Sequence, residues 1–320
     1  MDEKILCSIV IPAYNEELVV QETYKRLKTV MDSINEPYEL IFVNDGSKDN
    51  TAAIIRKLCE TDERVKLVDF SRNFGHQLAS TAGMDYSSGD TIVLIDADLQ
   101  DPPELIPEMI RKWREGYEVV YGVRIKRIGE TFFKKLTAKL FYRFMKSMTE
   151  VDMPLDTGDF RLIDRKVCNA LKAANEKNRY IRGLISWLGF KQIGIEYVRD
   201  KRFAGETKYP LKKMIKFAFD GITSFSYKPL RLATYFGTVI SGLSFLYLLV
   251  VLFQRLFTDD TVAGWASILA VSLFFNGIIL IILGIIGEYI GRIYDEVKGR
   301  PLYIVRETIN INTDKIEKRS

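Results

Sequence analysis

The sequence has few cysteines and almost no histidine, and each scarcity removes a class of chemistry. Cys7, Cys59 and Cys168 are the three cysteines among 320 residues, and no Cys-x-x-Cys pair occurs. This pattern predicts reduced thiols in a cytosolic domain, with neither disulfides nor a redox centre. His76 is the single histidine, so a metal site built from several histidines is excluded. We interpret His76 as a loop residue near the predicted ligand-binding site, with a structural rather than a catalytic role.

Two nucleotide-binding signatures are also missing. No Gly-x-Gly-x-x-Gly motif follows the first predicted strand, and no Gly-Lys-Ser/Thr P-loop occurs. Their absence argues against an NAD enzyme and against a P-loop NTPase. The formal net charge is only +4, so charge gives no reason to expect a nucleic-acid partner, and we expect none. The first four residues lead directly into a strand and have no signal-peptide architecture.

What the sequence does contain is an alternation of short apolar strands and amphipathic helices. Such alternation predicts an α/β domain with a mainly parallel, doubly wound sheet. The predicted strands are Cys7 to Pro12, Leu40 to Val43, Val65 to Phe70 and one that starts at Thr91, and the predicted helices run from Asn15 to about Ser33, Thr51 to Cys59 and about Gln77 to Tyr86.

Polar residues follow the ends of three predicted strands. They are Pro-Ala-Tyr-Asn-Glu at 12–16, Asn-Asp-Gly-Ser at 44–47 and Asp-Ala-Asp-Leu-Gln at 96–100. Ligands of open α/β sheets bind at the carboxyl ends of the strands, so we expect these segments to share one edge. Carboxylates there suit the ribose and base of a nucleotide, with Mg²⁺ or Mn²⁺ for its phosphates. A lone Asp-x-Asp is more often a solvated turn, but the three segments together favour a site.

These motifs resemble those of a known family. Ile-Val-Ile-Pro-Ala-Tyr-Asn-Glu at 9–16, Val-Asn-Asp-Gly-Ser at 43–47 and Asp-Ala-Asp-Leu-Gln-Asp-Pro-Pro at 96–103 resemble family-2 glycosyltransferases of the GT-A fold. The closer likeness is to their polyprenyl-phosphate branch, the dolichyl-phosphate mannosyltransferases and bactoprenol glucosyltransferases. It continues through Thr-Gly-Asp-Phe-Arg-Leu at 157–162 and Arg-Phe-Ala-Gly-Glu-Thr-Lys at 202–208.

The resemblance implies a role for each matching residue. Asp159 matches the carboxylate usually assigned as general base for inverting transfer. A lipid phosphate has a second pKa of roughly 6 and scarcely needs a base, so we leave Asp159 open between base and positioning of the acceptor or metal. The implied metal ligands are Asp98 and Gln100, for Mg²⁺ or Mn²⁺. The implied nucleotide-sugar contacts are Pro12, Tyr14, Glu16, Asp45, Asp96, Ala97 and Arg124, with Arg202 and Lys208 on a mobile loop that closes over the diphosphate.

Two long apolar blocks follow the α/β domain. Leu232 to Leu256 and Trp265 to Glu288 are each long enough to span a bilayer. Basic residues flank the pair and an acidic turn separates its members, which predicts a cytoplasmic catalytic domain and cytoplasmic termini. Residues 131–146 and 211–219 combine aromatic and basic side chains, which favours interfacial helices, or else packing against another subunit.

The predicted organisation is a GT-A catalytic domain at 1–210, an interfacial helix and linker at 211–229, two transmembrane helices within 230–290, and a cytoplasmic tail at 291–320. The predicted enzyme transfers a hexose, from UDP-glucose or UDP-N-acetylglucosamine, to polyprenyl phosphate at the bacterial inner membrane. Alternatives are a GDP-mannose-dependent mannosyltransferase and a non-catalytic membrane scaffold. A processive polysaccharide synthase is less favoured, because no Gln-x-x-Arg-Trp motif occurs. The resemblance also implies self-association as a homo-oligomer.

Overall fold

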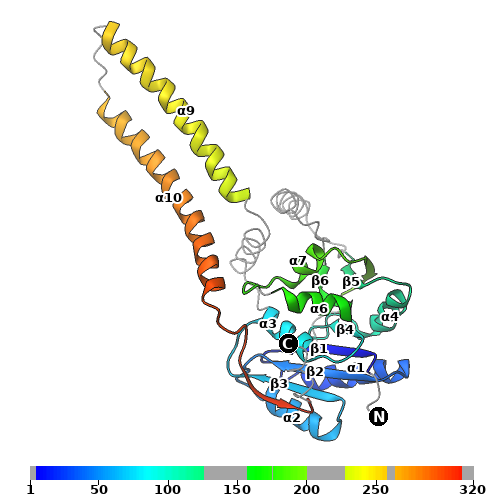
Figure 1. The fold of residues 1–320 in the computed structure, drawn as a ribbon. Coiled ribbons are helices and arrows are strands. Elements are labelled where there is room, and N and C mark those ends of the chain that lie inside the picture. Colours follow the sequence, from blue (N-terminus) through cyan, green and yellow to red (C-terminus); the bar gives the residue numbers. More distant parts are fainter. Residues whose placement is uncertain (1–4, 126–156, 175, 200–227, 258–263, 312–320) are drawn as a thin grey trace. The chain divides into compact units, whose positions relative to one another are not determined.

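The computed structural model describes residues 5–125, 157–174, 176–199, 228–257 and 264–311 (Figure 1). The chain divides into a unit that contains the sheet and the residues from Arg300 onward, and a unit that contains two long helices and ends at Gly299. Arg202, Lys208 and the two predicted interfacial segments, 131–146 and 211–219, lie outside the described residues.

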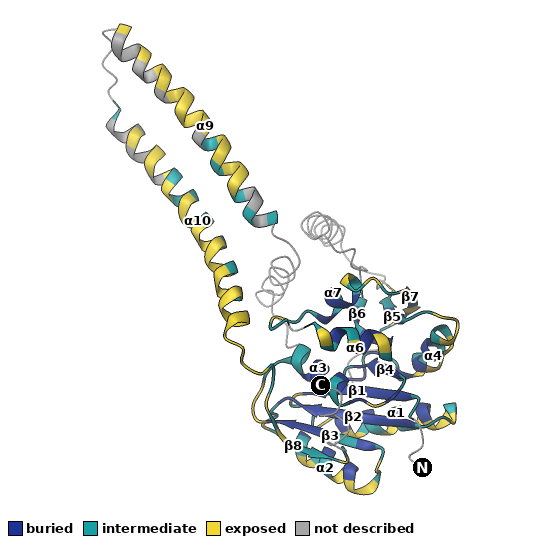
Figure 2. Ribbon diagram, in the orientation of Figure 1, coloured by how far each residue is buried: buried dark blue, intermediate teal, exposed yellow. Residues whose placement is uncertain are grey.

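The described residues of the first unit form a mixed eight-stranded sheet in the order β7-β5-β6-β4-β1-β2-β3-β8. Strands β4, β1, β2 and β3 are parallel neighbours, as the sequence predicts. Every residue of β1 and β2 is buried (Figure 2), which explains their nearly continuous apolar sequences. The strands are β1 (Cys7–Ala13), β2 (Tyr38–Asn44), β3 (Val65–Phe70), β4 (Thr91–Leu94), β5 (Val119–Arg124), β6 (Thr157–Asp164), β7 (Gln192–Tyr197) and β8 (Val305–Ile309).

Helices cover both faces of the sheet. Apolar residues of α1, α2 and α4 pack with alternate residues of the central strands in one core. Helix α3 packs on the opposite face, where Ala79 and Ala82 contact Val43 and Val68 in a second core, and α6 lies beside it through a contact between Cys168 and Met84. The helices are α1 (Val20–Ile34), α2 (Thr51–Thr61), α3 (His76–Tyr86), α4 (Ile106–Arg114), α6 (Arg165–Ala173) and α7 (Ile181–Trp187), with a short 3₁₀ turn at Pro103–Leu105.

Four strands of the sheet have no counterpart in the sequence prediction, and two of them reverse its direction. Strand β6 lies antiparallel between β4 and β5, and β8 lies antiparallel to β3. The sheet is therefore mixed rather than doubly wound throughout. The sequence of β6, Thr-Gly-Asp-Phe-Arg-Leu-Ile-Asp, mixes charged and apolar residues, because polar side chains point into the site from one face while Phe160 and Leu162 enter the core on the other.

The residues after the second long helix return to the sheet instead of forming only a tail. Strand β8 pairs with β3 at the edge of the sheet. Just before it, the Tyr303 ring stacks on Phe70 at 5.1 Å between centroids, and its hydroxyl donates to Asp85 Oδ2 at 2.9 Å. Arg56 donates to both Asp69 and Glu307 at 2.9 Å. These contacts attach residues 303–309 to the sheet of the first unit.

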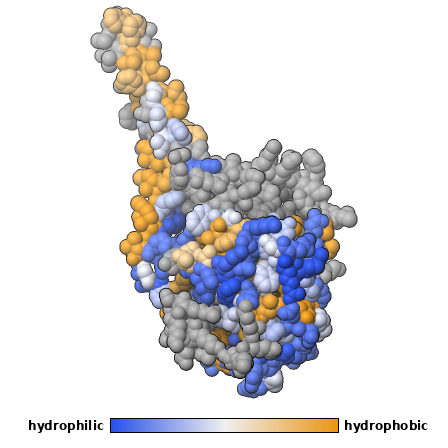
Figure 3. Space-filling view, turned by 45° about the vertical axis from the view of Figure 1, so that its right-hand side comes forward, coloured by the Kyte–Doolittle hydropathy of each residue, from blue (hydrophilic) through white to orange (hydrophobic). Residues whose placement is uncertain are grey.

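The second unit contains the long helices α9 (Lys228–Phe257) and α10 (Trp265–Val297). Most of their described side chains are exposed (Figure 2), and hydrophobic residues cover much of their surface (Figure 3). Within the described residues, the segment Phe274–Val297 has the length and the mean hydropathy, 1.9, for one membrane crossing. This segment overlaps the second predicted span but begins and ends further along the chain.

Candidate active site

The loops after β1 and β2 are held together at the carboxyl edge of the sheet. Backbone N–H groups of Asn15 and Glu16 donate to Ser47 Oγ at 3.0 Å and to Thr51 Oγ1 at 2.8 Å. The first helix therefore begins at Val20 and not at the predicted Asn15, whose φ of 54° is left-handed. Pro12 is buried at the end of β1, and Tyr14 and Glu16 extend beyond it.

Asp45 holds the loop that leads into α3. Its carboxylate accepts hydrogen bonds from Phe74 N at 2.6 Å, Gly75 N at 3.0 Å and Asn73 Nδ2 at 2.9 Å. Burial nevertheless raises its pKa. The close approach of this loop requires Gly46, whose φ is +65° and where an added Cβ would lie 2.4 Å from the Arg72 carbonyl carbon.

The Asp-x-Asp segment follows β4 and is largely enclosed. Asp98 is 8% exposed, and its Oδ1 accepts from Gln100 N at 3.1 Å. Ala97 is buried and its carbonyl accepts from Thr23 Oγ1 at 2.8 Å. Between the two predicted metal ligands, Leu99 has a φ of 56°, a conformation that costs a non-glycine residue about 1–2 kcal/mol. The surrounding contacts hold this strained turn, as is frequent at functional sites.

Asp159 on β6 is held by three side chains from two helices. Its Oδ2 lies 3.2 Å from His76 Nε2 and accepts from Gln77 Nε2 at 3.3 Å. Its Oδ1 lies 3.2 Å from Arg182 Nε of α7. His76 Nε2 also lies 3.5 Å from Asp96 Oδ1, so the imidazole lies between the two carboxylates. His76 is the first residue of α3 rather than a loop residue, and it contacts the predicted catalytic aspartate directly.

These contacts set the charges of the site. Burial lowers the pKa of His76, but the Asp96 and Asp159 carboxylates outweigh it and raise that pKa to about 9. Burial raises the pKa of Asp159, but His76 and Arg182 outweigh it and hold that pKa well below its usual range. Burial raises the pKa of Asp96 to about 6, with Asp159, Asp101 and Asp98 adding to the rise. The site is thus a group of carboxylates with a charged imidazolium among them.

Arg124 lies on the opposite face of β6 from Asp159. Its Nε donates to the Tyr197 hydroxyl at 3.2 Å, and its guanidinium lies 3.7 Å from Asp101 Oδ1. The fully buried Asp101 also accepts from Tyr197. Gly158 leaves room for the Arg124 guanidinium in this position, because an added Cβ would lie 2.2 Å from it.

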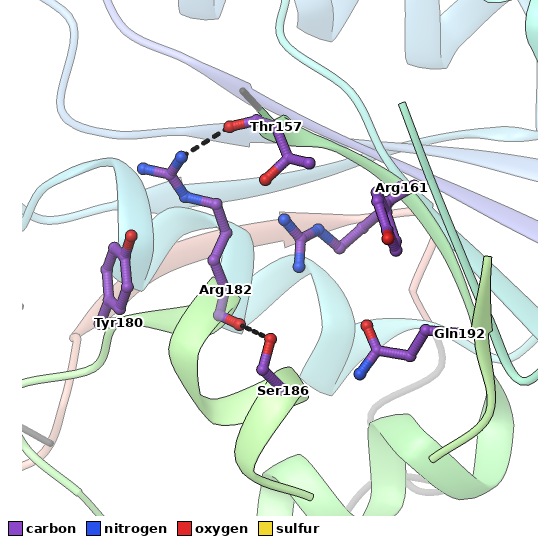
Figure 4. A pocket seen from close by; sticks show the side chains of 7 residues that line it. Thr157, Arg161, Tyr180, Arg182, Ser186 and Gln192 are labelled. Carbon is purple, nitrogen blue, oxygen red and sulfur yellow. Dashed lines mark hydrogen bonds between the residues drawn. The ribbon is translucent and has the colours of Figure 1, made fainter. Parts of the chain in front are cut away.

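A small polar pocket lies beside Asp159. Its walls come from β5, β6, β7 and the region of α7 (Figure 4), and it encloses about 30 Å³. Arg182 donates from Nη1 to the Thr157 carbonyl at 2.8 Å. Arg161 donates from Nη2 to the Gly158 carbonyl at 2.8 Å. The lining residues are Tyr121, Thr157, Arg161, Tyr180, Arg182, Ser186 and Gln192.

The segment Asp-Ala-Asp-Leu-Gln at 96–100 suits a divalent cation that takes its remaining ligands from outside this segment. Among the described residues, no three His, Cys, Asp or Glu side chains form a metal-binding group. The enclosed carboxylate of Asp98 and the amide oxygen of Gln100 are hard donors, and burial together with the neighbouring carboxylates raises the pKa of Asp96, an environment that favours a cation. Mg²⁺ typically uses one or two carboxylates and takes its other ligands from substrate phosphates and water.

The structure brings together only part of the predicted site. Asp96 and Asp159 meet at His76, whereas Arg124 pairs with Asp101 on the other face of β6. The sequence predicted His76 near the site with a structural role, and it predicted no role for Gln77 or Arg182. The one available signal was that Gln77 directly follows the single histidine of the sequence.

Comparisons with known proteins agree with this architecture. A model of glycosyl transferase family 2 matches residues 8–172, and a model described as the GtrB C-terminal hairpin matches residues 228–293. The uncharacterized glycosyltransferase YkcC of Bacillus subtilis (strain 168) is 63% identical over 316 residues, covering 99% of this chain and 98% of that protein. The bactoprenol glucosyl transferase of Shigella phage SfII is 40% identical over 301 residues, covering 94% and 97%.

A solved structure also aligns with the chain. It is glucosyl-3-phosphoglycerate synthase from Mycobacterium tuberculosis, crystallised with Mn²⁺, UDP and glucosyl-3-phosphoglycerate. The match has 20% identity and a TM-score of 0.43, and it covers 68% of this chain and 78% of that one. The family model spans half of the chain, and the relatives match it nearly from end to end. With its GT-A-like mixed α/β sheet, the chain belongs to glycosyltransferase family 2.

Proposed function

We propose that the protein transfers a hexose from a nucleotide sugar to polyprenyl phosphate, with inversion at the anomeric carbon. The observation that carries this proposal is the meeting of Asp96 and Asp159 through His76, beside the enclosed Asp98. The relatives named bactoprenol glucosyl transferases support a polyprenyl phosphate as acceptor and glucose as sugar. UDP-glucose is the first donor to test and UDP-N-acetylglucosamine the second.

In the proposed reaction, an oxygen of the acceptor phosphate attacks the anomeric carbon of the sugar. The bond from that carbon to the diphosphate breaks, and the nucleoside diphosphate leaves with the electron pair. A divalent ion held by Asp98 and Gln100 would neutralise charge on the leaving diphosphate. Of the basic residues predicted to contact the diphosphate, Arg124 lies within the part of the chain that the structure describes. Its guanidinium lies 3.7 Å from Asp101 Oδ1, and Asp101 directly follows the segment 96–100.

The surroundings of Asp159 favour positioning over general-base catalysis. A general base works best when its pKa lies near the operating pH, whereas His76 and Arg182 hold the pKa of Asp159 well below its usual range. A phosphate acceptor with a second pKa of roughly 6 is largely a dianion at neutral pH and has no proton to lose. Asp159 therefore orients His76 and Arg182, and the acceptor attacks without transferring a proton.

We further propose that the reaction takes place at the cytoplasmic face of the membrane, with α9 and α10 as two spans and both termini in the cytoplasm. The apolar segment Phe274–Val297 and the hairpin match at 228–293 support insertion. Lys228 and Arg231 lie in the first turn of α9, and Arg292, Lys298 and Arg300 lie near the end of α10, which supports a cytoplasmic position for both ends by the positive-inside rule.

The experiment that tests this proposal incubates membranes containing the protein with radiolabelled nucleotide sugars, undecaprenyl phosphate and Mg²⁺ or Mn²⁺. We expect label in a lipid that mass spectrometry identifies as a hexosyl phosphate lipid, and we expect UDP-glucose to be the best donor. If GDP-mannose were the single donor that gave labelled lipid, the donor would be GDP-mannose and not UDP-glucose. No labelled lipid from any donor, with either metal present, would overturn the function.

A further inference from the structure

The pocket beside Asp159 contains two guanidinium groups and no carboxylate among its lining residues. Arg161 reaches it from β6 and Arg182 from α7 (Figure 4). The other polar lining groups, from Thr157, Tyr180, Ser186 and Gln192, include hydroxyl and amide groups that can donate hydrogen bonds. The composition is that of a site for an oxyanion.

Arg161 is short of partners within the described residues. It is only 4% exposed, and its Nη2 donates a hydrogen bond to the Gly158 carbonyl. Its buried Nε has no hydrogen-bond acceptor among the residues that the structure describes. Burial, together with the nearby charge of Arg182, lowers its pKa to about 10. A buried cation in this state would be stabilised by an anion placed in the pocket.

Asp159, a described carboxylate close to both arginines, is already shared between partners. Asp159 Oδ1 lies 3.2 Å from Arg182 Nε, while Oδ2 lies 3.2 Å from His76 Nε2. Asp159 thus faces the charged His76 as well as two guanidinium groups. Because Asp96 also contacts His76, three cations face two carboxylates here, so an anion is favoured on the pocket side of Arg182.

We propose that this pocket binds the phosphate group of the lipid acceptor, with Arg161 and Arg182 on its oxygens. The inference rests on the proposed function and adds the place where the acceptor is held. The enclosed 30 Å³ is room for about two oxygens, at roughly 10–15 Å³ for each water-sized atom. It is too small for a sugar ring or a base, so the rest of the headgroup lies in the opening.

This placement gives Asp159 and Arg182 distinct roles. Arg182 binds the acceptor phosphate, and Asp159 is a positioning residue that orients Arg182 through its Nε. The third oxygen of the phosphate attacks the anomeric carbon, the carbon–diphosphate bond breaks, and the nucleoside diphosphate takes the electron pair. The dianionic acceptor releases no proton, so the step balances without a base.

The test is steady-state kinetics of the full chain in detergent with Arg182→Gln, Arg182→Lys and Arg161→Lys. Losing a charge-assisted contact should raise KM for undecaprenyl phosphate about tenfold to hundredfold. The KM for the nucleotide sugar should stay within about twofold of wild type, and Arg182→Lys should lie between wild type and Arg182→Gln. The matched control is Arg111→Gln, because Arg111 is an exposed arginine of α4 that pairs with Glu108 and Glu115. Circular dichroism and thermal melting establish that each variant folds.

Inhibition by inorganic phosphate distinguishes a pocket for the lipid phosphate from a pocket for free phosphate. We expect it to compete with undecaprenyl phosphate, and its inhibition constant should rise in Arg182→Gln. Phosphate that binds at Arg182 without competing with the lipid would make the pocket a free-phosphate site and overturn the acceptor assignment.

An unchanged lipid KM in folded Arg182→Gln and Arg161→Lys, with wild type active, would overturn the inference and leave the proposed function standing. A wild-type protein that glycosylates no lipid phosphate would overturn both.

Discussion

Carboxylates lie at both edges of the central parallel strands, and their surroundings differ completely. At the amino edge, Glu39 of β2 is buried and paired with Lys66. It also accepts hydrogen bonds from Ser8 Oγ at 2.5 Å, Ser88 N at 2.7 Å and Ser88 Oγ at 2.9 Å. At the carboxyl edge, Asp96 faces Asp98, Asp101 and Asp159, and its Oδ1 lies 3.5 Å from His76 Nε2.

The difference appears in the pKa values. Burial raises the pKa of both carboxyl groups, but Lys66 and the hydrogen bonds outweigh it at Glu39, whose pKa lies below its usual range. At Asp96 the neighbouring carboxylates add to burial, and the pKa rises to about 6. A fully partnered carboxylate stabilises the fold, whereas a crowded one is adapted to a cation or a ligand that arrives later.

Asp98→Ala breaks the carboxyl edge and has the largest expected effect. Removing the proposed metal ligand should lower kcat for glycolipid formation at least about a hundredfold, as for the loss of one strong electrostatic contact to a transition state. Labelled-lipid assays over a range of Mn²⁺ concentrations measure it, and chelation with EDTA should have a similar effect on wild type. Glu108→Gln on the exposed surface of α4 is the control. Wild-type activity in Asp98→Ala would remove this residue from the metal site.

Asp159→Asn tests whether Asp159, at the carboxyl edge of the sheet, is a general base. We expect kcat to fall about tenfold to hundredfold because Arg182 and His76 lose their shared partner. The acidic limb of the wild-type pH profile should lie near the second phosphate pKa of roughly 6, and it should persist in the variant, because the pKa of Asp159 lies below its usual range. If the limb belongs to wild type alone and vanishes in Asp159→Asn, Asp159 is the base.

Glu39→Gln breaks the amino edge and should affect stability, not catalysis. An unpaired Lys66 beside a buried amide should cost about 3 kcal/mol of unfolding free energy. In wild type, a lowered folded-state pKa contributes stability above the unfolded-state pKa of about 4.3, and this stability is lost as the pH falls through the folded-state value. Urea unfolding of the full chain in detergent at pH 7 and pH 4 measures both effects. A variant as stable as wild type at pH 7 would contradict this role of Glu39.

Tyr303→Phe has the smallest expected effect and tests the strand that extends the sheet beyond β3. The variant keeps the stacking on Phe70 and loses the hydrogen bond to Asp85, which should cost about 1 kcal/mol. Thermal melting detects such a change, and Tyr294→Phe in α10 is the control for a lost tyrosine hydroxyl. An unchanged melting temperature would mean that the returning chain contributes little to the catalytic unit.

The sequence predicted the central strands well because their environment is recorded in their own residues. Strand β3 begins and ends at the predicted Val65 and Phe70, and the polar segments at 12–16, 44–47 and 96–100 lie at or just beyond the carboxyl ends of β1, β2 and β4. A strand covered on both faces must be apolar, and parallel strands end at a common edge, so local composition was sufficient.

The sequence alone determined the family, the parallel core and the acidic motif after β4. Tertiary structure decided which groups surround Asp159, because β6 enters the sheet antiparallel between β4 and β5 and so faces α3 and α7. It also decided that β8 returns to β3. The physical reason is that strand pairing uses backbone groups that every residue carries. The sequence of a short, partly polar strand therefore does not predict which strands it pairs with. A continuous apolar run, in contrast, does predict that the strand is buried.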